Sequence, residues 1–263
     1  MTWTTLPRSE AFGLPAIVAG QGPRCILLHG VGLRAEAWNP LIDALSARFE
    51  VIAPDMPGHG KTPMRSGLNE LRDYSDRIAP LLSERSVVIG HSMGAMIALD
   101  LAQRFAGQIA GVVALNAIFE RSDAAKAAVQ ARAGSLDGQS MADPSGTLDR
   151  WFAATASDER AACHAWLTEV SPVGYKAAYS VFAKEDGPSR SALKQLDMPA
   201  LFMTGADEPN STPEMSQSMA DLAPHGQAKV VPDAAHMLPM THPETTAQAL
   251  MSFAQAAFDR KGA

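Results

Sequence analysis

A serine in the first half of the chain has the surroundings of a nucleophile. Ser92 stands in the pentapeptide GHSMG, between Gly90 and Gly94. Residues 86–90 have the β-branched, apolar pattern of a buried strand, and the apolar residues from 93 onward have that of a buried helix. A turn from strand to helix within about four residues puts the backbone at its apex under strain. The pattern G-x-S-x-G in this strand–turn–helix context predicts an exposed, reactive hydroxyl.

A serine hydroxyl needs a base, and the base needs a carboxylate to orient it. Of the seven histidines, His91 adjoins the serine, but we expect its side chain to point elsewhere at so sharp a bend. His236 occupies the short loop PDAAHMLP directly after the last expected strand. This loop should open at the same sheet edge as the serine turn, because the carboxyl ends of parallel strands share one edge. We therefore predict His236 as the base.

One loop offers the orienting acid. The chain order expected for this topology is serine, acid, histidine. The segment GADEPNSTP follows the apolar run at 200–205 and carries Asp207 and Glu208 side by side. Neighbouring residues on a turn point in different directions, so only one of the two can hold the imidazole. The residue pattern by itself leaves open which one.

Two glycine-rich stretches partly match the sequence motifs of phosphate-binding loops. HGVGLRA, residues 29–35, satisfies G-x-G-x-x-A after a strand, and Asp55 ends the next strand as a dinucleotide-binding acid would. The best helix start, at Asn39-Pro40, comes several residues too late for a phosphate site on that helix. GHGKT, residues 58–62, lacks the first glycine of a P-loop, because Asp55 holds that position. A nucleotide-dependent oxidoreductase is therefore only a distant alternative.

The candidate residues need a common framework, and two blocks of alternating elements predict one. The expected strands lie near 15–19, 25–29, 50–53, 86–90, 111–116, 200–205 and 228–231. The expected helices of the same blocks lie near 40–48, 68–83, 93–106, 213–222 and 244–259. This alternation predicts an α/β fold whose mostly parallel sheet has helices on both faces.

A strand-free segment, residues 119–194, separates the two blocks. Its later helices are expected near 148–156, 159–170 and 174–185. We expect a core built from residues 1–118 and 195–263, with 119–194 inserted as a helical lid. Six aromatic residues in the insertion indicate an apolar pocket wall: Trp151, Phe152, Trp166, Tyr175, Tyr179 and Phe182. Arg34 and Arg121 flank the expected site, and either could bind a substrate carboxylate.

Composition narrows the class of protein. The 263 residues are 46% hydrophobic and 19% charged, which is enough apolar material for a substantial core. The net charge of −6, without a Lys/Arg cluster, argues against a nucleic-acid surface. The chain start does not resemble a signal peptide, and no apolar run approaches the ~18 residues of a membrane span. We expect a cytoplasmic protein with a small-molecule substrate and no cofactor, metal, nucleic-acid or membrane partner; a homodimer stays open.

Several segments together resemble the α/β-hydrolase fold family. They are His29-Gly30, DMPGHGKT, GHSMGA, the acidic loop and AAHMLPMTHPE, in matching order and spacing over nearly the whole chain. The insertion falls where that family carries its lid. Family members usually have an aspartate three residues after the glycine of the acidic loop, a place that Glu208 holds here, with Asp207 one residue earlier. The resemblance therefore favours Glu208 as the acid, since glutamate also serves in such triads.

The resemblance also implies an activity. The family forms an oxyanion hole from two backbone N–H groups, which correspond here to those of Val31 and Met93. It implies a cofactor-free serine hydrolase that cleaves a small carboxylic ester, lactone or amide through an acyl-enzyme. Hydrolysis of a carbon–carbon bond in a ring-cleavage product is the alternative within the fold. A non-hydrolytic lyase or ligand receptor on the same fold is the other.

Overall fold

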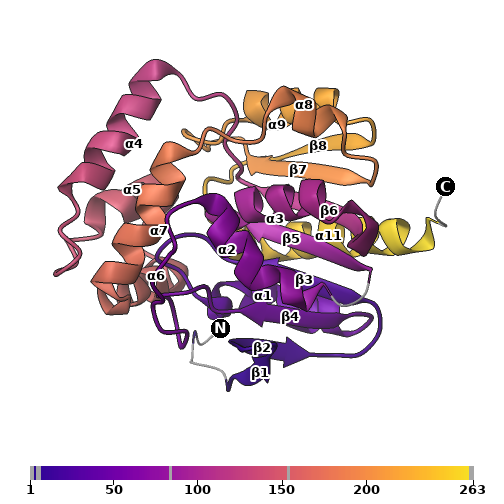
Figure 1. Ribbon diagram of the computed structural model, residues 1–263, viewed down its shortest axis with the longest axis horizontal. Coiled ribbons are helices and arrows are strands. Elements are labelled where there is room, and N and C mark those ends of the chain that lie inside the picture. The colour runs from indigo at the N-terminus through magenta and orange to yellow at the C-terminus, as the bar shows by residue number, and fades with distance from the viewer. Residues whose placement is uncertain (1–2, 4–6, 83–84, 153–154, 261–263) are drawn as a thin grey trace.

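A twisted sheet forms the centre of the molecule (Figure 1). The computed structural model describes Trp3 and residues 7–82, 85–152 and 155–260. Within them the sheet has eight strands in the order β1-β2-β4-β3-β5-β6-β7-β8. The strands are β1 Ser9–Ala11, β2 Leu14–Ala19, β3 Arg24–Leu28, β4 Glu50–Pro54, β5 Ser86–His91, β6 Ile109–Leu115, β7 Ala200–Gly205 and β8 Gly226–Val231. β1, β2 and β4 pair antiparallel and the remaining neighbours pair parallel, which confirms the predicted fold class.

The central strands are apolar on both faces, as expected for parallel strands that helices cover on each side. Every residue of β5, β6 and β7 is buried. Ile26 pairs in register with Val88, and Val88 with Val112, so the three side chains lie on the same face. Edge strand β1 was not expected from the sequence, because three residues are too few to show an alternating pattern.

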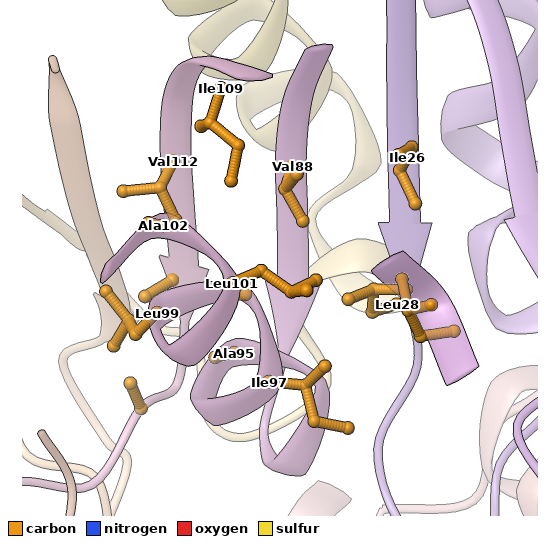
Figure 2. Packing of buried hydrophobic residues seen from close by; sticks show 14 of the residues in the cluster. Ile26, Leu28, Val88, Ala95, Ile97, Leu99, Leu101, Ala102, Ile109 and Val112 are labelled. Carbon is orange, nitrogen blue, oxygen red and sulfur yellow. The ribbon is translucent and has the colours of Figure 1, made fainter. Parts of the chain in front are cut away.

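Helices cover both faces of the sheet. One face carries α2 Leu71–Ile78, α3 Met93–Arg104 and α9 Pro213–Leu222, whose apolar residues join one core cluster. The other face carries α1 Asn39–Ser46 and α11 Pro243–Asp259, whose apolar residues join a second cluster. Figure 2 shows the first cluster, where Leu28 and Val88 of adjacent strands lie around Leu101 of α3.

All the regular secondary structure described between β6 and β7 is helical. It contains α4 Asp123–Ser135, α5 Ser145–Phe152, α6 Asp158–Glu169, α7 Pro172–Lys184 and α8 Arg190–Lys194. Figure 1 shows α4 to α7 grouped at one end of the sheet, whereas α8 lies beside α9. Four of these helices begin after a serine whose hydroxyl accepts a backbone N–H bond, a strong N-cap signal: Ser122, Ser157, Ser171 and Ser189.

Two expected helices differ in extent. The helix expected at 68–83 forms as α2 and then tightens into a short 3-10 turn at Ala79–Leu81, with Pro80 inside that turn. The helix expected at 148–156 begins earlier, with α5, and positions 153–154 lie outside the described residues. None of the helices in the described part of the chain has the length and apolarity needed to cross a membrane.

Candidate active site

Ser92 lies at a strained turn between β5 and α3. Its backbone angles are φ 56° and ψ −120°, in a region that non-glycine residues rarely adopt. The turn is tight because the chain passes very close to itself. A β-carbon added to Gly94 would lie 2.1 Å from the carbonyl oxygen of Leu28, and one added to Gly90 would lie 2.0 Å from that of Gly94. Only glycine fits at these two positions.

We expect Gly94→Ala to lower the free energy of unfolding by about 2–4 kcal/mol, because the new methyl group meets rigid strand backbone. The matched control is Gly107→Ala, where an added β-carbon meets nothing within 4 Å. Urea unfolding of both variants measures the difference. Equal effects of the two substitutions would show that the close approach at the turn does not constrain residue 94.

The imidazole of His236 is held by a buried carboxylate. Its Nδ1 lies 2.6 Å from Oε2 of Glu208. The other oxygen, Oε1, accepts the backbone N–H groups of Asn210 at 2.9 Å and Ser211 at 3.4 Å. Asn116 donates its amide N–H to Oε2 at 3.1 Å. Two side chains and two backbone groups thus fix the Glu208 carboxylate.

The surroundings of Glu208 keep it ionised. Burial alone raises the pKa of this carboxyl, but the neighbouring His236, through charge and hydrogen bond, and the N–H groups of Asn210 and Ser211 outweigh burial. The net result is a pKa of about 2. The adjacent Asp207 is exposed and lines a separate outer hollow. The structure therefore brings Glu208, and not Asp207, to the imidazole.

Two further rings contact His236. His91 lies with its ring centroid 4.9 Å away and donates its Nε2–H to the backbone carbonyl of His236 at 2.8 Å. Burial, followed by the proximity of His236, lowers the pKa of His91 to about 3, so its ring is neutral. On the other side the indole of Trp151, from α5, stacks on the imidazole at 5.4 Å and 23°. His91, dismissed as a base from the sequence, is thus placed to hold His236.

Neutral buried histidines predict acid sensitivity of the fold. Burial lowers the pKa of both His59 and His91 to about 3, against 6.5 for an exposed histidine. Between pH 6.5 and 3 the unfolded chain therefore binds more protons than the folded one, and the stabilisation that is complete above pH 6.5 is lost as the pH falls. We expect the free energy of unfolding to fall on the order of 1 kcal/mol per pH unit for each histidine.

Urea unfolding between pH 7.5 and 4.5 measures this slope. His59→Gln should flatten it, whereas the exposed His164→Asn should leave it unchanged. If the free energy of unfolding of the unsubstituted protein did not change between pH 6.5 and 4.5, the assignment of His59 and His91 as neutral buried rings would be contradicted.

The two expected oxyanion donors lie next to the serine. Met93 is the first residue of α3, so its N–H has no partner within the helix. Gly30 approaches the serine so closely that a β-carbon there would lie 3.0 Å from Cβ of Ser92. His29 fixes this loop, since its Nδ1–H donates to the Gly30 carbonyl at 2.8 Å and its Nε2 accepts the Met56 N–H. Val31, the residue after Gly30, lines the cavity above Ser92 that is described below.

Asp55 has a structural role that removes the dinucleotide alternative. Its carboxylate is buried and receives two hydrogen bonds from the guanidinium of Arg8, at 2.8 and 3.1 Å. It also accepts the backbone N–H groups of Ala35 and Lys61, both at 2.9 Å. A carboxylate bound on both oxygens by the protein is not presented to a ribose. It instead ties together the loops that follow β3 and β4.

A cavity of about 520 Å³ opens above Ser92, His236 and Val31, within the usual size range for small-molecule sites. Helices α4, α5 and α7 supply much of its wall. Four of the six expected aromatic residues line it: Trp151, Tyr175, Tyr179 and Phe182. The other two do not, since Phe152 lines the outer hollow and Trp166 packs edge-on against Trp3.

The two arginines singled out from the sequence have different surroundings. Arg34 is absent from this cavity; it pairs with Glu169 at 3.1 Å and lies over the Trp166 ring. Arg121 does line the cavity. Its guanidinium donates to the carbonyls of Glu185 at 2.6 Å and Phe182 at 3.3 Å, at the end of α7. Arg121 therefore closes a helix terminus, where a positive charge is favourable.

Sequence reasoning did not single out several polar side chains of the cavity, among them Asn116, Arg132 and Arg150. Asn116 follows β6, adjacent to the serine strand, and the shared-edge argument that found His236 could have found it. Arg132 and Arg150 also line the cavity, but which faces of α4 and α5 turn inward depends on how the lid helices pack, and the sequence does not show that packing. No group of three or more potential metal ligands occurs among the described residues.

Comparisons with known proteins agree with this arrangement. A family model described as "Alpha/beta hydrolase family" matches residues 25–249. The chain is 35% identical over 240 residues, covering 89% of it and 91% of the relative, to an (E)-2-((N-methylformamido)methylene)succinate hydrolase of Acinetobacter baylyi. It is 30% identical, over 86% of its length and 95% of the relative, to a pimeloyl-[acyl-carrier protein] methyl ester esterase of Aromatoleum aromaticum.

A solved structure shares the architecture. It is a thermophilic esterase from Thermogutta terrifontis with malate bound, which superposes with a TM-score of 0.83 at 25% identity over 93% of this chain and 94% of that one. The family model covers most of the chain, and the sequence relatives align over nearly their whole length. The chain therefore belongs to the alpha/beta hydrolase family.

Proposed function

We propose that this enzyme is a serine hydrolase that cleaves a small carboxylic ester or amide through an acyl-enzyme. The observation that carries the proposal is the 2.6 Å contact between His236 and buried Glu208, in a cavity shared with Ser92. A buried, ionised carboxylate on Nδ1 keeps the proton on that nitrogen and leaves Nε2 free to act as a base. The proposed triad is therefore Ser92, His236 and Glu208.

In the proposed reaction the Ser92 hydroxyl attacks the substrate carbonyl while His236 takes its proton. The tetrahedral oxyanion accepts hydrogen bonds from the backbone N–H groups of Val31 and Met93, and His236 then protonates the leaving group. A water molecule, deprotonated by His236, then attacks the acyl-enzyme ester in the same way. This step releases the carboxylic acid product and restores the Ser92 hydroxyl. Ser92 makes no hydrogen bond to His236 in this structure, and such contacts commonly tighten only when substrate is bound.

We assign the inserted segment 119–194 the role of a lid, carried by its helices α4 to α7. Support comes from α4, α5 and α7, which supply much of the wall of the cavity that contains Ser92 and His236. The names of the two sequence relatives, one acting on a compound with an amide and one on a methyl ester, support acyl chemistry on a small molecule. No contact in the cavity specifically favours carbon–carbon hydrolysis.

A chain-length series of 4-nitrophenyl esters and matching anilides tests the proposal. A cavity of this size predicts the highest kcat/KM for short acyl chains and a stepwise decline for longer ones. Turnover should disappear in a Ser92→Ala variant. No turnover of any ester or anilide would contradict ester or amide hydrolysis and would direct the search to the carbon–carbon alternative.

A further inference from the structure

Two guanidinium groups converge on one hydroxyl in the cavity. Arg132, from α4, donates to Oγ1 of Thr147 at 2.8 Å and to the hydroxyl of Tyr175 at 3.2 Å. Arg150, one turn after Thr147 on α5, donates to the same Oγ1 at 3.3 Å. All four side chains line the cavity that contains Ser92. Three helices of the lid therefore bring their polar groups to one point.

This group contains donors without a matching acceptor. Oγ1 of Thr147 accepts two N–H groups and the hydroxyl oxygen of Tyr175 accepts one, so the O–H of each is left to donate. Within the described residues neither hydroxyl has a recorded acceptor. Thr147 and Tyr175 are buried, Arg132 is half-buried, and Arg150 is exposed at the rim. Buried donors in this arrangement are costly unless an acceptor satisfies them.

The charges in this group are also unbalanced. In the described part of the chain, neither Arg132 nor Arg150 forms an ion pair with a carboxylate. Arg132 additionally lies over the ring of Tyr179, 5.1 Å from its centroid. Three other arginines in and around the lid are paired with acids at 3.1 Å or less: Arg34 with Glu169, Arg160 with Asp149 and Arg190 with Glu120. The third arginine of the cavity, Arg121, donates instead to two backbone carbonyls. Of the described residues that line this cavity, none has an acidic side chain.

We infer that Arg132, Arg150, Thr147 and Tyr175 form a subsite for a carboxylate of the substrate. A carboxylate offers the acceptors that the two hydroxyls and the free guanidinium N–H groups need, and a planar guanidinium binds it in two places at once. The inference rests on the proposed function in one respect, that this cavity holds the substrate. It restricts the substrate class to small acyl compounds that carry a carboxylate in addition to the bond that is cleaved.

Direct binding to the Ser92→Ala variant tests the subsite without turnover. Isothermal titration compares succinate with succinamide, its uncharged isostere. We expect succinate to bind at least tenfold more tightly. Replacing Arg132 with methionine, in the same background, should weaken succinate binding about 10- to 100-fold, the range for loss of a charge-assisted hydrogen bond. The Kd for succinamide should change less than threefold, which shows that the cavity is still folded.

Two more variants complete the design. Arg150→Met, at an exposed position where folding is not at risk, should also weaken succinate binding, but less than Arg132→Met. Arg34→Met removes an arginine outside the cavity and should leave the Kd for succinate unchanged. Equal binding of succinate and succinamide, or equal losses in the Arg132 and Arg34 variants, would overturn the subsite. Because no catalysis is involved, this failure is distinct from an absence of ester or amide hydrolysis.

Discussion

Replacing Ser92 with alanine is expected to lower kcat/KM by about 10⁴-fold or more, while the protein stays folded. The oxyanion donors and the histidine cannot replace the attacking oxygen, so only the catalysis that binding and electrostatics supply would remain. Stability should be unchanged or higher, because the Ser92 hydroxyl has no hydrogen bond to His236 in this structure and its loss breaks no such contact. The measurements are steady-state kinetics on 4-nitrophenyl acetate and the Tm of both proteins.

Ser252→Ala, on the exposed side of α11, is the matched control for this substitution and should retain full activity. A Ser92→Ala enzyme whose activity lies within tenfold of the unsubstituted protein would contradict the assignment of Ser92 as the nucleophile.

Replacing Glu208 with glutamine is expected to lower kcat/KM by about 10³- to 10⁴-fold, with a smaller effect on KM. The side-chain shape is kept, but the negative charge that holds the Nδ1 proton and stabilises the imidazolium is lost. Without that charge the neutral imidazole can carry its proton on Nε2 instead of Nδ1. In that tautomer Nε2 cannot accept the proton of the Ser92 hydroxyl.

Asp207→Asn is the natural control, because it makes the same chemical change one residue earlier, on an exposed side chain that does not reach His236. It should change kcat/KM less than threefold. Equal, mild losses in the two variants would mean that the orienting acid is neither Glu208 nor Asp207.

The sequence was sufficient to predict the fold class because the local signals agreed. The buried strand before Ser92, the glycines around it and the apolar helix after it are short-range features, and each strand–helix alternation is visible without knowledge of the packing. His236 could be singled out from the rule that parallel strands end at one edge. These arguments need only element order and chain direction.

Choices that depend on side-chain direction could not be made from the sequence. The residue pattern alone did not separate the neighbours Asp207 and Glu208; the family resemblance favoured Glu208, and the path of the loop after β7 is what turns that side chain inward. Arg34 follows the expected oxyanion residue Val31 by three positions in the chain, yet its side chain reaches out to Glu169. Arg132 and Arg150 belong to helices whose inward faces are set by packing within the lid, which residue periodicity did not reveal.

Labelling with a fluorophosphonate tests the central claim, the activation of Ser92 by His236 and Glu208, most directly. Intact-mass and peptide-mass analysis of the labelled protein should show one adduct per chain, on Ser92, formed rapidly in the unsubstituted enzyme and at least a hundredfold more slowly in His236→Ala and Glu208→Gln. An adduct on another residue, or labelling of Ser92 at the same rate in all three proteins, would contradict the account.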